Sequence, residues 1–230
     1  MNASIPENAA VINRTLVLLL LLPCIAQAQQ ADVRITGGTV YDGSGGAPRV
    51  TDVLLRGDRI VRIGDGANWT VTRTIDARGM IVAPGFIDPH IHAGGDLASS
   101  DRNRRQAAFA LMQGITTVIT GNDGQGPVAV GETLARYQRD SIGPNAALLV
   151  GHGNVRGQVL GAADRAPSDS ELNLMRSLVD SAMRGGALGM SSGLYYAPGS
   201  FAATDEVVAL AEVVARYGGI YDSHIRDEST

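Results

Sequence analysis

The sequence of 230 residues contains no lysine, because all 19 of its basic residues are arginines. This absence excludes any catalytic amine or metal bridge that lysine would supply within these residues. The chain has one cysteine, Cys24, so no disulfide can form within it. The formal net charge of −4 argues against a protein that binds nucleic acid through a basic face.

Aromatic residues make up only 4% of the chain, and the sequence shows no basic patch, no aromatic platform and no internal repeat. A binding module therefore has no positive support. The hydrophobic fraction of 44% and the charged fraction of 18% are ordinary for a globular protein and exclude a disordered tail or a fibrous repeat. The length suffices for one large domain with a substantial core.

The apolar run near the start, Leu16–Leu22, is far shorter than the ~20 residues that a membrane-spanning helix needs. It follows Arg14 and precedes Ala26–Ala28, whose small residues have the spacing of a signal-peptidase site. We therefore expect residues 1–28 to be a signal peptide cleaved after Ala28, and the mature protein to be secreted, to a periplasm. Cleavage after Ala28 would also remove Cys24. The alternative is a lipoprotein, in which a lipid is attached to Cys24.

Residues 29–80 show short β-type segments separated by turns rich in glycine and aspartate. Strands are predicted at Asp32–Ile35, Gly38–Tyr41, Asp52–Arg56, Arg59–Ile63 and Arg73–Ile75. This series predicts a small antiparallel sheet in an N-terminal β-sandwich subdomain. The other half of that sandwich is expected from residues after the printed sequence.

The pattern changes at Ile81, where apolar runs begin to alternate with amphipathic stretches. Buried strands are predicted at Ile81–Ile87, Ile115–Thr120, Ala146–Val150, Ala187–Met190 and Gly219–Tyr221. Helices are predicted at Arg104–Gln113, at about 170–184 after a capping box at Ser168, and at Asp205–Tyr217 after a cap at Thr204. Strands that recur every ~30–40 residues indicate βα units.

Residues 81–230 are therefore predicted to have an α/β fold, an incomplete TIM-type (β/α) barrel with about five of its eight βα units. In such a barrel the active site lies at the C-terminal ends of the strands. Because a closed barrel needs eight strands, we expect the printed sequence to be an N-terminal fragment of a longer protein.

Four histidines occur in the chain, and two of them form the pair His90 and His92. In an extended segment residues i and i+2 point to the same face, so both rings can reach one cation. An isolated pair of this kind is more often two surface histidines. Here His152 and His224 also follow predicted strands, and Asp123 follows another, so the set predicts a metal site at the barrel rim.

Histidine and carboxylate ligands suit Zn²⁺, with Mn²⁺ or Co²⁺ as alternatives. Since no lysine is present, a carboxylate has to bridge two cations if two are bound, and Asp123 is placed to do so. A metal-bound hydroxide is then the expected nucleophile, and the metal polarises the scissile carbonyl. The reaction also needs a general base, for which no carboxylate of the sequence is an obvious candidate.

Other residues near these positions have weaker functional indications. Asp88 is expected either to support the histidine pair or to form a turn, rather than to bind the metal. For His152, a structural role in the core and a substrate contact are equally compatible with the pattern. Arg226 and Glu228 either form an internal ion pair or face the substrate, and the sequence leaves both open.

Five segments together resemble the D-aminoacylase (N-acyl-D-amino-acid deacylase) branch of the amidohydrolase superfamily. The segments are Asp32–Gly43, Pro84–His92, Gly151–Arg156, Gly189–Tyr196 and Tyr221–Glu228. The resemblance implies a distorted TIM barrel with a small β-sandwich. It also implies zinc-dependent hydrolysis of an N-acyl-D-amino acid to a carboxylate and the free D-amino acid.

The resemblance also implies roles for single residues. His90 and His92 match the ligands of the first strand, His224 matches the ligand of the fifth strand, and Tyr196 matches a tyrosine that holds the substrate carboxylate. The family usually has a cysteine ligand where this chain has Asp123, which replaces a soft thiolate by a hard carboxylate. A further histidine ligand and the aspartate that acts as general base are expected beyond Thr230.

The sequence thus predicts a secreted, metal-dependent hydrolase of linear amides that acts on a small N-acyl amino acid, with no nucleic-acid partner and no stable membrane span. Its predicted ligands are His90, His92, Asp123 and His224, and its substrate contacts are Tyr196, His152 and Arg226. A dipeptidase or cyclic-imide hydrolase is the alternative within the same class. The alternative from another class is a non-catalytic remnant that binds metal at most. The acyl group, the preferred side chain and the oligomeric state are not determined.

Overall fold

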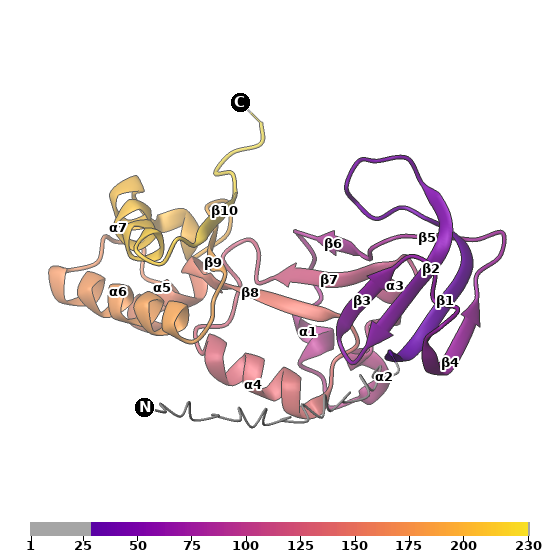
Figure 1. The fold of residues 1–230 in the computed structure, drawn as a ribbon. Coiled ribbons are helices and arrows are strands. Elements are labelled where there is room, and N and C mark those ends of the chain that lie inside the picture. Colours follow the sequence, from indigo (N-terminus) through magenta and orange to yellow (C-terminus); the bar gives the residue numbers. More distant parts are fainter. Residues whose placement is uncertain (1–28, 230) are drawn as a thin grey trace, which may run out of the picture. The chain divides into compact units, whose positions relative to one another are not determined.

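The computed structural model describes residues 29–229, which divide into two compact units between Ala83 and Pro84 (Figure 1). The predicted signal peptide lies outside the described residues. Within residues 29–229 no helix is both long enough and apolar enough to cross a membrane.

The first unit is a five-stranded mixed sheet. Its strands are β1 (Gln30–Val40), β2 (Arg49–Arg56), β3 (Arg59–Ile63), β4 (Thr70–Asp76) and β5 (Ile81–Val82). The order is β3-β2-β1-β4, with β5 also paired to β1. β1 and β3 run antiparallel to β2, but β4 and β5 run parallel to β1. The prediction of an antiparallel sheet is therefore wrong for two of the five strands.

The two strands predicted before residue 42 are one continuous strand, β1. Its pairing with β2 shifts register between Ile35 and Gly38, and Gly37 there has a φ of 75°. A glycine tolerates this left-handed backbone, so the strand passes through a bulge and continues. The turn-like glycine pair marks the bulge rather than the end of a strand.

The predicted strand Ile81–Ile87 is also wrong, because the structure divides it between the two units. Ile81 and Val82 pair with β1, and the amide of Tyr41 donates to the carbonyl oxygen of Val82 at 2.9 Å. Pro84 follows and has no amide hydrogen to continue a ladder. The second unit begins its sheet only at β6 (Phe86–Asp88).

The second unit has a curled sheet of five parallel strands. After β6 come β7 (Ile115–Thr120), β8 (Asn145–Gly151), β9 (Gly189–Gly193) and β10 (Ile220–His224). Their spatial order follows the chain order, and every neighbouring pair is parallel. This arrangement confirms the predicted incomplete TIM-type barrel.

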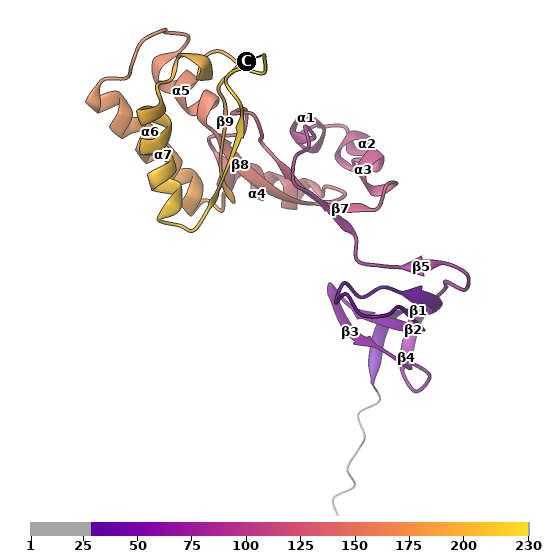
Figure 2. The ribbon, with the colours of Figure 1, turned by 90° about the horizontal axis from the view of Figure 1, so that it is seen from above.

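Helices connect the strands of the second unit. They are α1 (Gly94–Leu97), α2 (Arg102–Arg105), α3 (Ala108–Leu111), α4 (Val130–Asp140), α5 (His152–Leu160), α6 (Asp169–Arg184) and α7 (Thr204–Ala215), with a short 3₁₀ turn, η1 (Gly199–Phe201). α5, α6 and α7 lie together beside β8, β9 and β10 (Figures 1 and 2). Buried side chains of α6 and α7, such as Val179 and Leu210, belong to the same core as Val150 and Met190 of the sheet.

The helix predictions had mixed outcomes. The capping box at Ser168 is present and starts α6, as predicted. The predicted helix Arg104–Gln113 is broken because Ala107 has a φ of 44°, which separates α2 from α3. Thr204 is the first residue of α7 rather than its cap, and no side chain caps that helix. α5 was not predicted, since its two glycines lower the helix propensity of the segment.

Candidate metal centre

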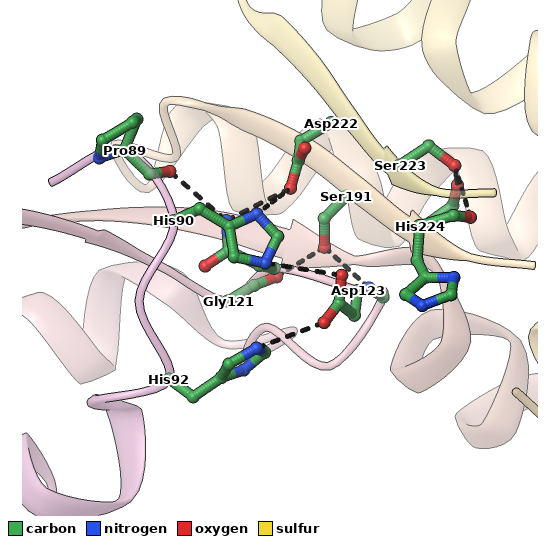
Figure 3. A network of polar contacts seen from close by, with 12 residues as sticks. Pro89, His90, His92, Gly121, Asp123, Ser191, Asp222, Ser223 and His224 are labelled. Carbon is green, nitrogen blue, oxygen red and sulfur yellow. Dashed lines mark hydrogen bonds and ion pairs between the residues drawn. The ribbon is translucent and has the colours of Figure 1, made fainter.

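Three of the predicted ligands come together at the carboxyl ends of β6 and β7. His90 and His92 lie in the segment after β6, and Asp123 lies in the loop after β7. Each offers one ligand atom, and these atoms all lie within 4.8 Å of one another. Figure 3 shows both imidazole rings turned toward the carboxylate of Asp123.

The carboxylate of Asp123 faces one histidine with each oxygen. Its Oδ1 is 3.7 Å from Nε2 of His90, and its Oδ2 is 3.3 Å from Nε2 of His92. The side chain of Asp123 is only 10% exposed, whereas those of His90 and His92 are 46% and 65% exposed. A carboxylate buried beneath two accessible imidazoles is a donor set of two nitrogens and one oxygen that fits a divalent cation such as zinc.

The loop that carries Asp123 is held by close contacts between backbones. The amide of Gly124 donates to Oγ of Ser191 in β9 at 3.0 Å, and that hydroxyl donates to the carbonyl of Gly121. A Cβ atom on Gly193 would lie 2.2 Å from the carbonyl oxygen of Asp123. Asp123 itself has a φ of 55°, a region that aspartate and asparagine tolerate better than most residues. The glycines thus let the loop lie directly on the sheet.

Asn154 is a supporting residue that the sequence reasoning missed. Its side-chain amide donates to the carbonyl oxygens of Gln125 at 2.9 Å and Gly126 at 3.0 Å, and its backbone amide donates to Gly124 at 3.2 Å. It therefore ties the start of α5 to the Asp123 loop. Its position in the Gly151–Arg156 segment was the available signal, because that segment follows a barrel strand.

Asp222 is a second residue that was missed. It lies in β10, and its Oδ2 is 3.6 Å from Nδ1 of His90 and accepts a hydrogen bond from Nδ2 of Asn122 at 3.1 Å. In a strand, residues i and i+2 point to the same face, so the histidine at position 224 marked Asp222 as a neighbour of the same rim. Asp88 accepts a hydrogen bond from the backbone amide of His90 at 3.0 Å, a contact typical of a turn, which is one of the two roles expected for it.

His224 lies at the end of β10 but does not belong to the three-residue group. Its Nε2 is 3.1 Å from Oε1 of Glu228, and its Nδ1 is 2.9 Å from the carbonyl oxygen of Ile225. Its ring centroid is 4.9 Å from that of Tyr196 and 5.7 Å from that of Tyr195. Both ring nitrogens therefore face neighbours on its own segment, and the ring packs in an aromatic cluster.

A cavity of about 270 Å³ connects Asp123 with Tyr196. Its other lining residues are Gly124, Gln125, Gly153, Asn154, Gly193, Ala197, Pro198 and Gly199. Four of these are glycines, so much of the wall is backbone. Tyr196 is 41% exposed and lies at the cavity, where a substrate contact was predicted for it.

His152 does not reach this cavity. Its side chain is fully buried, and its Nε2 is 2.9 Å from Oε1 of Glu206. Arg156, also fully buried, donates to the other oxygen of the same carboxylate. Burial raises the pKa of Glu206, but the hydrogen bonds from His152 and Arg156 outweigh it and the pKa is lowered overall. Of the two roles left open for His152, this environment matches a structural role in the core, since its Nε2 is hydrogen-bonded to Glu206.

The side chain of Arg226 is also hydrogen-bonded within the protein. Its guanidinium donates to the carbonyl oxygens of Ser200 and Ala202, at 2.9 Å each. These bonds fasten the segment after β10 to the turn η1. In this structure Arg226 therefore joins two segments of the protein, and its predicted substrate contact stays a prediction.

Comparison with known proteins identifies the class. Residues 73–219 match the sequence model of the amidohydrolase family, and the chain belongs to that family. It is 36% identical to a D-aminoacylase from Alcaligenes xylosoxydans xylosoxydans over 226 residues, which cover 88% of this chain and 46% of that protein. It is 38% identical to an N-acyl-D-aspartate deacylase of the same organism over 224 residues, which cover 87% of this chain and 44% of that protein.

Comparison with solved structures points to the same family. The chain superimposes on a copper complex of a D-aminoacylase mutant with a TM-score of 0.79 at 33% identity, covering 86% of this chain and 46% of that one. It also superimposes on the N-acyl-D-glutamate deacylase of Bordetella bronchiseptica, which was crystallised with zinc and a phosphonate inhibitor. The TM-score is 0.77 at 34% identity, and the match covers 87% of this chain and 46% of that one. The chain spans less than half the length of these relatives.

Proposed function

We propose that this protein hydrolyses the linear amide bond of an N-acyl-D-amino acid and releases a carboxylate and the free D-amino acid. The observation that carries the proposal is the group formed by His90, His92 and Asp123 beside a cavity that extends to Tyr196. The relatives with this fold are a D-aminoacylase and acidic N-acyl-D-amino-acid deacylases, which supports the same reaction class.

His90, His92 and Asp123 would hold the cation, and Zn²⁺ fits their donor atoms, with Mn²⁺ and Co²⁺ as alternatives. Such a cation supplies Lewis-acid polarisation of a carbonyl and activation of water. His224 is proposed as a fourth ligand, although in the structure its two ring nitrogens face Glu228 and the carbonyl oxygen of Ile225. The bound zinc in the N-acyl-D-glutamate deacylase supports zinc as the first metal to test.

The residues of the cavity bind and orient the substrate. Tyr196 carries a phenol, which can donate a hydrogen bond to the carboxylate of an N-acyl amino acid. The backbone wall formed by Gly124, Gly153 and Gly193 offers space where side chains would exclude a small molecule. Asp123 faces histidine with both oxygens, so it serves as a ligand rather than as the general base.

The test is hydrolysis by the full-length gene product loaded with zinc. N-acetyl derivatives of D-glutamate, D-aspartate and D-leucine would be compared with their L-isomers, with dipeptides and with hydantoins. We expect cleavage of D-isomers and none of the L-isomers. Equal rates on both isomers would reject the stereochemical part, faster cleavage of dipeptides or hydantoins would favour the other hydrolases, and zinc binding without hydrolysis would indicate a non-catalytic remnant.

We also propose that the protein is exported and cleaved after Ala28. The support is the sequence pattern alone, an apolar run between Arg14 and the small residues before Gln29. Mass spectrometry of the protein from a periplasmic fraction is expected to give an N-terminus at Gln29. Intact residues 1–28 in cytoplasmic protein would reject this proposal.

A further inference from the structure

A second cavity, of about 310 Å³, adjoins the candidate metal centre at His92. Its wall is formed by residues of α1, by the loop after β7 and by one face of α4. Gln125 lines this cavity and also the cavity that extends from Asp123 to Tyr196. A small molecule at the metal centre therefore has two neighbouring cavities to extend into, one beside His92 and one beside Asp123.

The wall of the second cavity carries a positive charge. Among the described residues that line it there is one arginine, Arg136, and no aspartate or glutamate. Thr133, Arg136 and Tyr137 share one face of α4, because residues three and four apart in a helix are neighbours. Burial raises the pKa of the Tyr137 phenol, and the nearby charge of Arg136 opposes this shift. No acidic residue of the wall neutralises that charge.

The guanidinium of Arg136 has no polar partner within residues 29–229. Its Nε is buried and donates no hydrogen bond there, and Glu132, one turn earlier on α4, forms no ion pair with it. By contrast, Nε of Arg139 on the same helix is 3.0 Å from Oδ1 of Asp140. A buried donor without a partner costs free energy, and a carboxylate satisfies a guanidinium with two parallel hydrogen bonds. A bound carboxylate would thus supply the partner that Arg136 lacks.

Asn122 adds an acceptor to the same wall. It is 1% exposed, and its Nδ2 donates to the carbonyl oxygen of Pro89 at 3.4 Å and to Oδ2 of Asp222 at 3.1 Å. Its Oδ1 is buried and has no hydrogen-bond partner in the described part of the chain. An N-acyl amino acid has both a carboxylate and an amide N–H, so it offers a partner to Arg136 and to Asn122.

We infer that this cavity is a second substrate subsite, in which Arg136 binds a carboxylate. The inference rests on the proposed function and deepens it, because it makes the preferred substrates N-acyl-D-amino acids with a second carboxylate. Tyr196 is the proposed partner of the α-carboxylate in the other cavity. The second carboxylate therefore belongs either to the amino-acid side chain or to the acyl group. Arg136 selects the substrate and takes no part in bond cleavage.

The test compares three substrates of the zinc-loaded full-length gene product. N-acetyl-D-leucine has one carboxylate, N-acetyl-D-glutamate has a second one on its side chain, and N-succinyl-D-leucine has a second one on its acyl group. We expect the wild type to prefer an acidic substrate over N-acetyl-D-leucine. Whichever acidic substrate is preferred identifies the source of the second carboxylate.

The variant Arg136→Gln removes the charge and keeps a side chain of similar length. The ratio of kcat/KM for the acidic substrate to kcat/KM for N-acetyl-D-leucine should fall about 10–100-fold, the effect of losing a hydrogen bond to a charged group. The loss should appear mainly in KM, because a contact away from the reacting amide is made equally in the ground state and the transition state.

Two further variants keep the test decisive if Arg136→Gln also affects folding. Arg136→Lys retains the positive charge and should keep more of the preference than Arg136→Gln. Arg139→Gln on the same helix is the matched control, since Arg139 pairs with Asp140 and does not line this cavity, and it should leave the ratio unchanged. A wild type that prefers N-acetyl-D-leucine, a wild-type ratio in Arg136→Gln, or equal losses in both variants at position 136 would overturn the inference.

The outcomes also distinguish this inference from the proposed function. If the full-length protein cleaves none of the three compounds, the proposed function fails. Isothermal titration calorimetry with the same compounds then still tests the subsite, because binding to Arg136 needs no hydrolysis, and tighter binding of an acidic compound should be lost in Arg136→Gln. If the protein cleaves N-acetyl-D-leucine best and Arg136→Gln changes no ratio, only the inference fails.

Discussion

Gly126 lies so close to Leu149 that a Cβ atom at position 126 would come within 1.8 Å of the leucine carbonyl oxygen. The carbonyl of Gly126 in turn accepts the amide of Gly151 at 3.2 Å. This contact closes the loop that begins at Gly121 and contains Asp123, and it presses the loop onto β8. The position of the carboxylate between two histidines therefore depends on a residue without a side chain.

Substitution Gly126→Ala should displace the Asp123 loop. The added methyl group has no flexible neighbour to move, so we expect a loss of about 1–3 kcal/mol in the free energy of unfolding and weaker zinc binding. Urea unfolding and zinc titration measure the two effects. Gly157→Ala in α5 is the matched control, since its Cβ would meet only Pro198 at 3.9 Å. Equal stability of both variants would contradict this account of the loop.

Asp123→Asn should remove metal binding while preserving the fold. Asparagine has nearly the same shape and tolerates the φ of 55° at this position, but it has no charge to offset a cation between two imidazoles. Removing a residue that only hydrogen-bonds to a metal ligand lowers metal affinity about 10–100-fold. Removing the ligand Asp123 itself should therefore lower the affinity for zinc by more than about 100-fold. Zinc titration with circular dichroism checks both parts. Zinc binding at the wild-type affinity would exclude Asp123 as a ligand.

Asp123→Cys should change metal preference rather than abolish binding. A thiolate is a softer ligand than a carboxylate, so the variant should gain affinity for Cd²⁺ relative to Mn²⁺. We expect the ratio of the two dissociation constants to shift by at least about tenfold from that of the wild type. Parallel titrations with each metal give this ratio. A ratio equal to the wild-type value would show that position 123 does not select the metal.

Glu206→Gln should destabilise the fold without a direct effect on the metal centre. The carboxylate of Glu206 compensates the charge of Arg156, which is fully buried. Breaking a buried ion pair costs about 3–5 kcal/mol, because the remaining charge has no partner. The measurement is the free energy of unfolding in urea. Glu212→Gln, exposed on the same helix, should change it by less than about 0.5 kcal/mol, and an equally small effect at position 206 would refute the buried-pair account.

The same pair predicts a dependence on pH. The pKa of Glu206 in the folded protein is below its ordinary value of 4.5, so the folded state binds fewer protons at this site than the unfolded state. Its contribution to stability is full above about pH 4.5 and is lost as the pH falls through the folded pKa. The difference in unfolding free energy between wild type and Glu206→Gln should therefore shrink in acid. A difference that grows below that pH would contradict the sign.

Predictions from local sequence signals were confirmed where the residues that define an element lie close together in the chain. The capping box of Ser168 and Glu171 starts α6 because the two residues satisfy each other's backbone donors. Such predictions were wrong where a segment pairs with a strand from a distant part of the chain. Ile81 and Val82 read as the start of a barrel strand, but they pair with β1 forty residues earlier, because Thr39 and Tyr41 offer free backbone donors there.

The sequence by itself determined the parallel βα pattern and the rim on which His90, His92 and Asp123 meet, because strand periodicity and strand ends are local properties. Only the tertiary structure decided which polar residues face that rim. It buried His152 against Glu206 and brought Asp222 to His90, and those contacts join residues 54 and 132 positions apart. No spacing in the sequence encodes such contacts, since they depend on how helices and strands pack against one another.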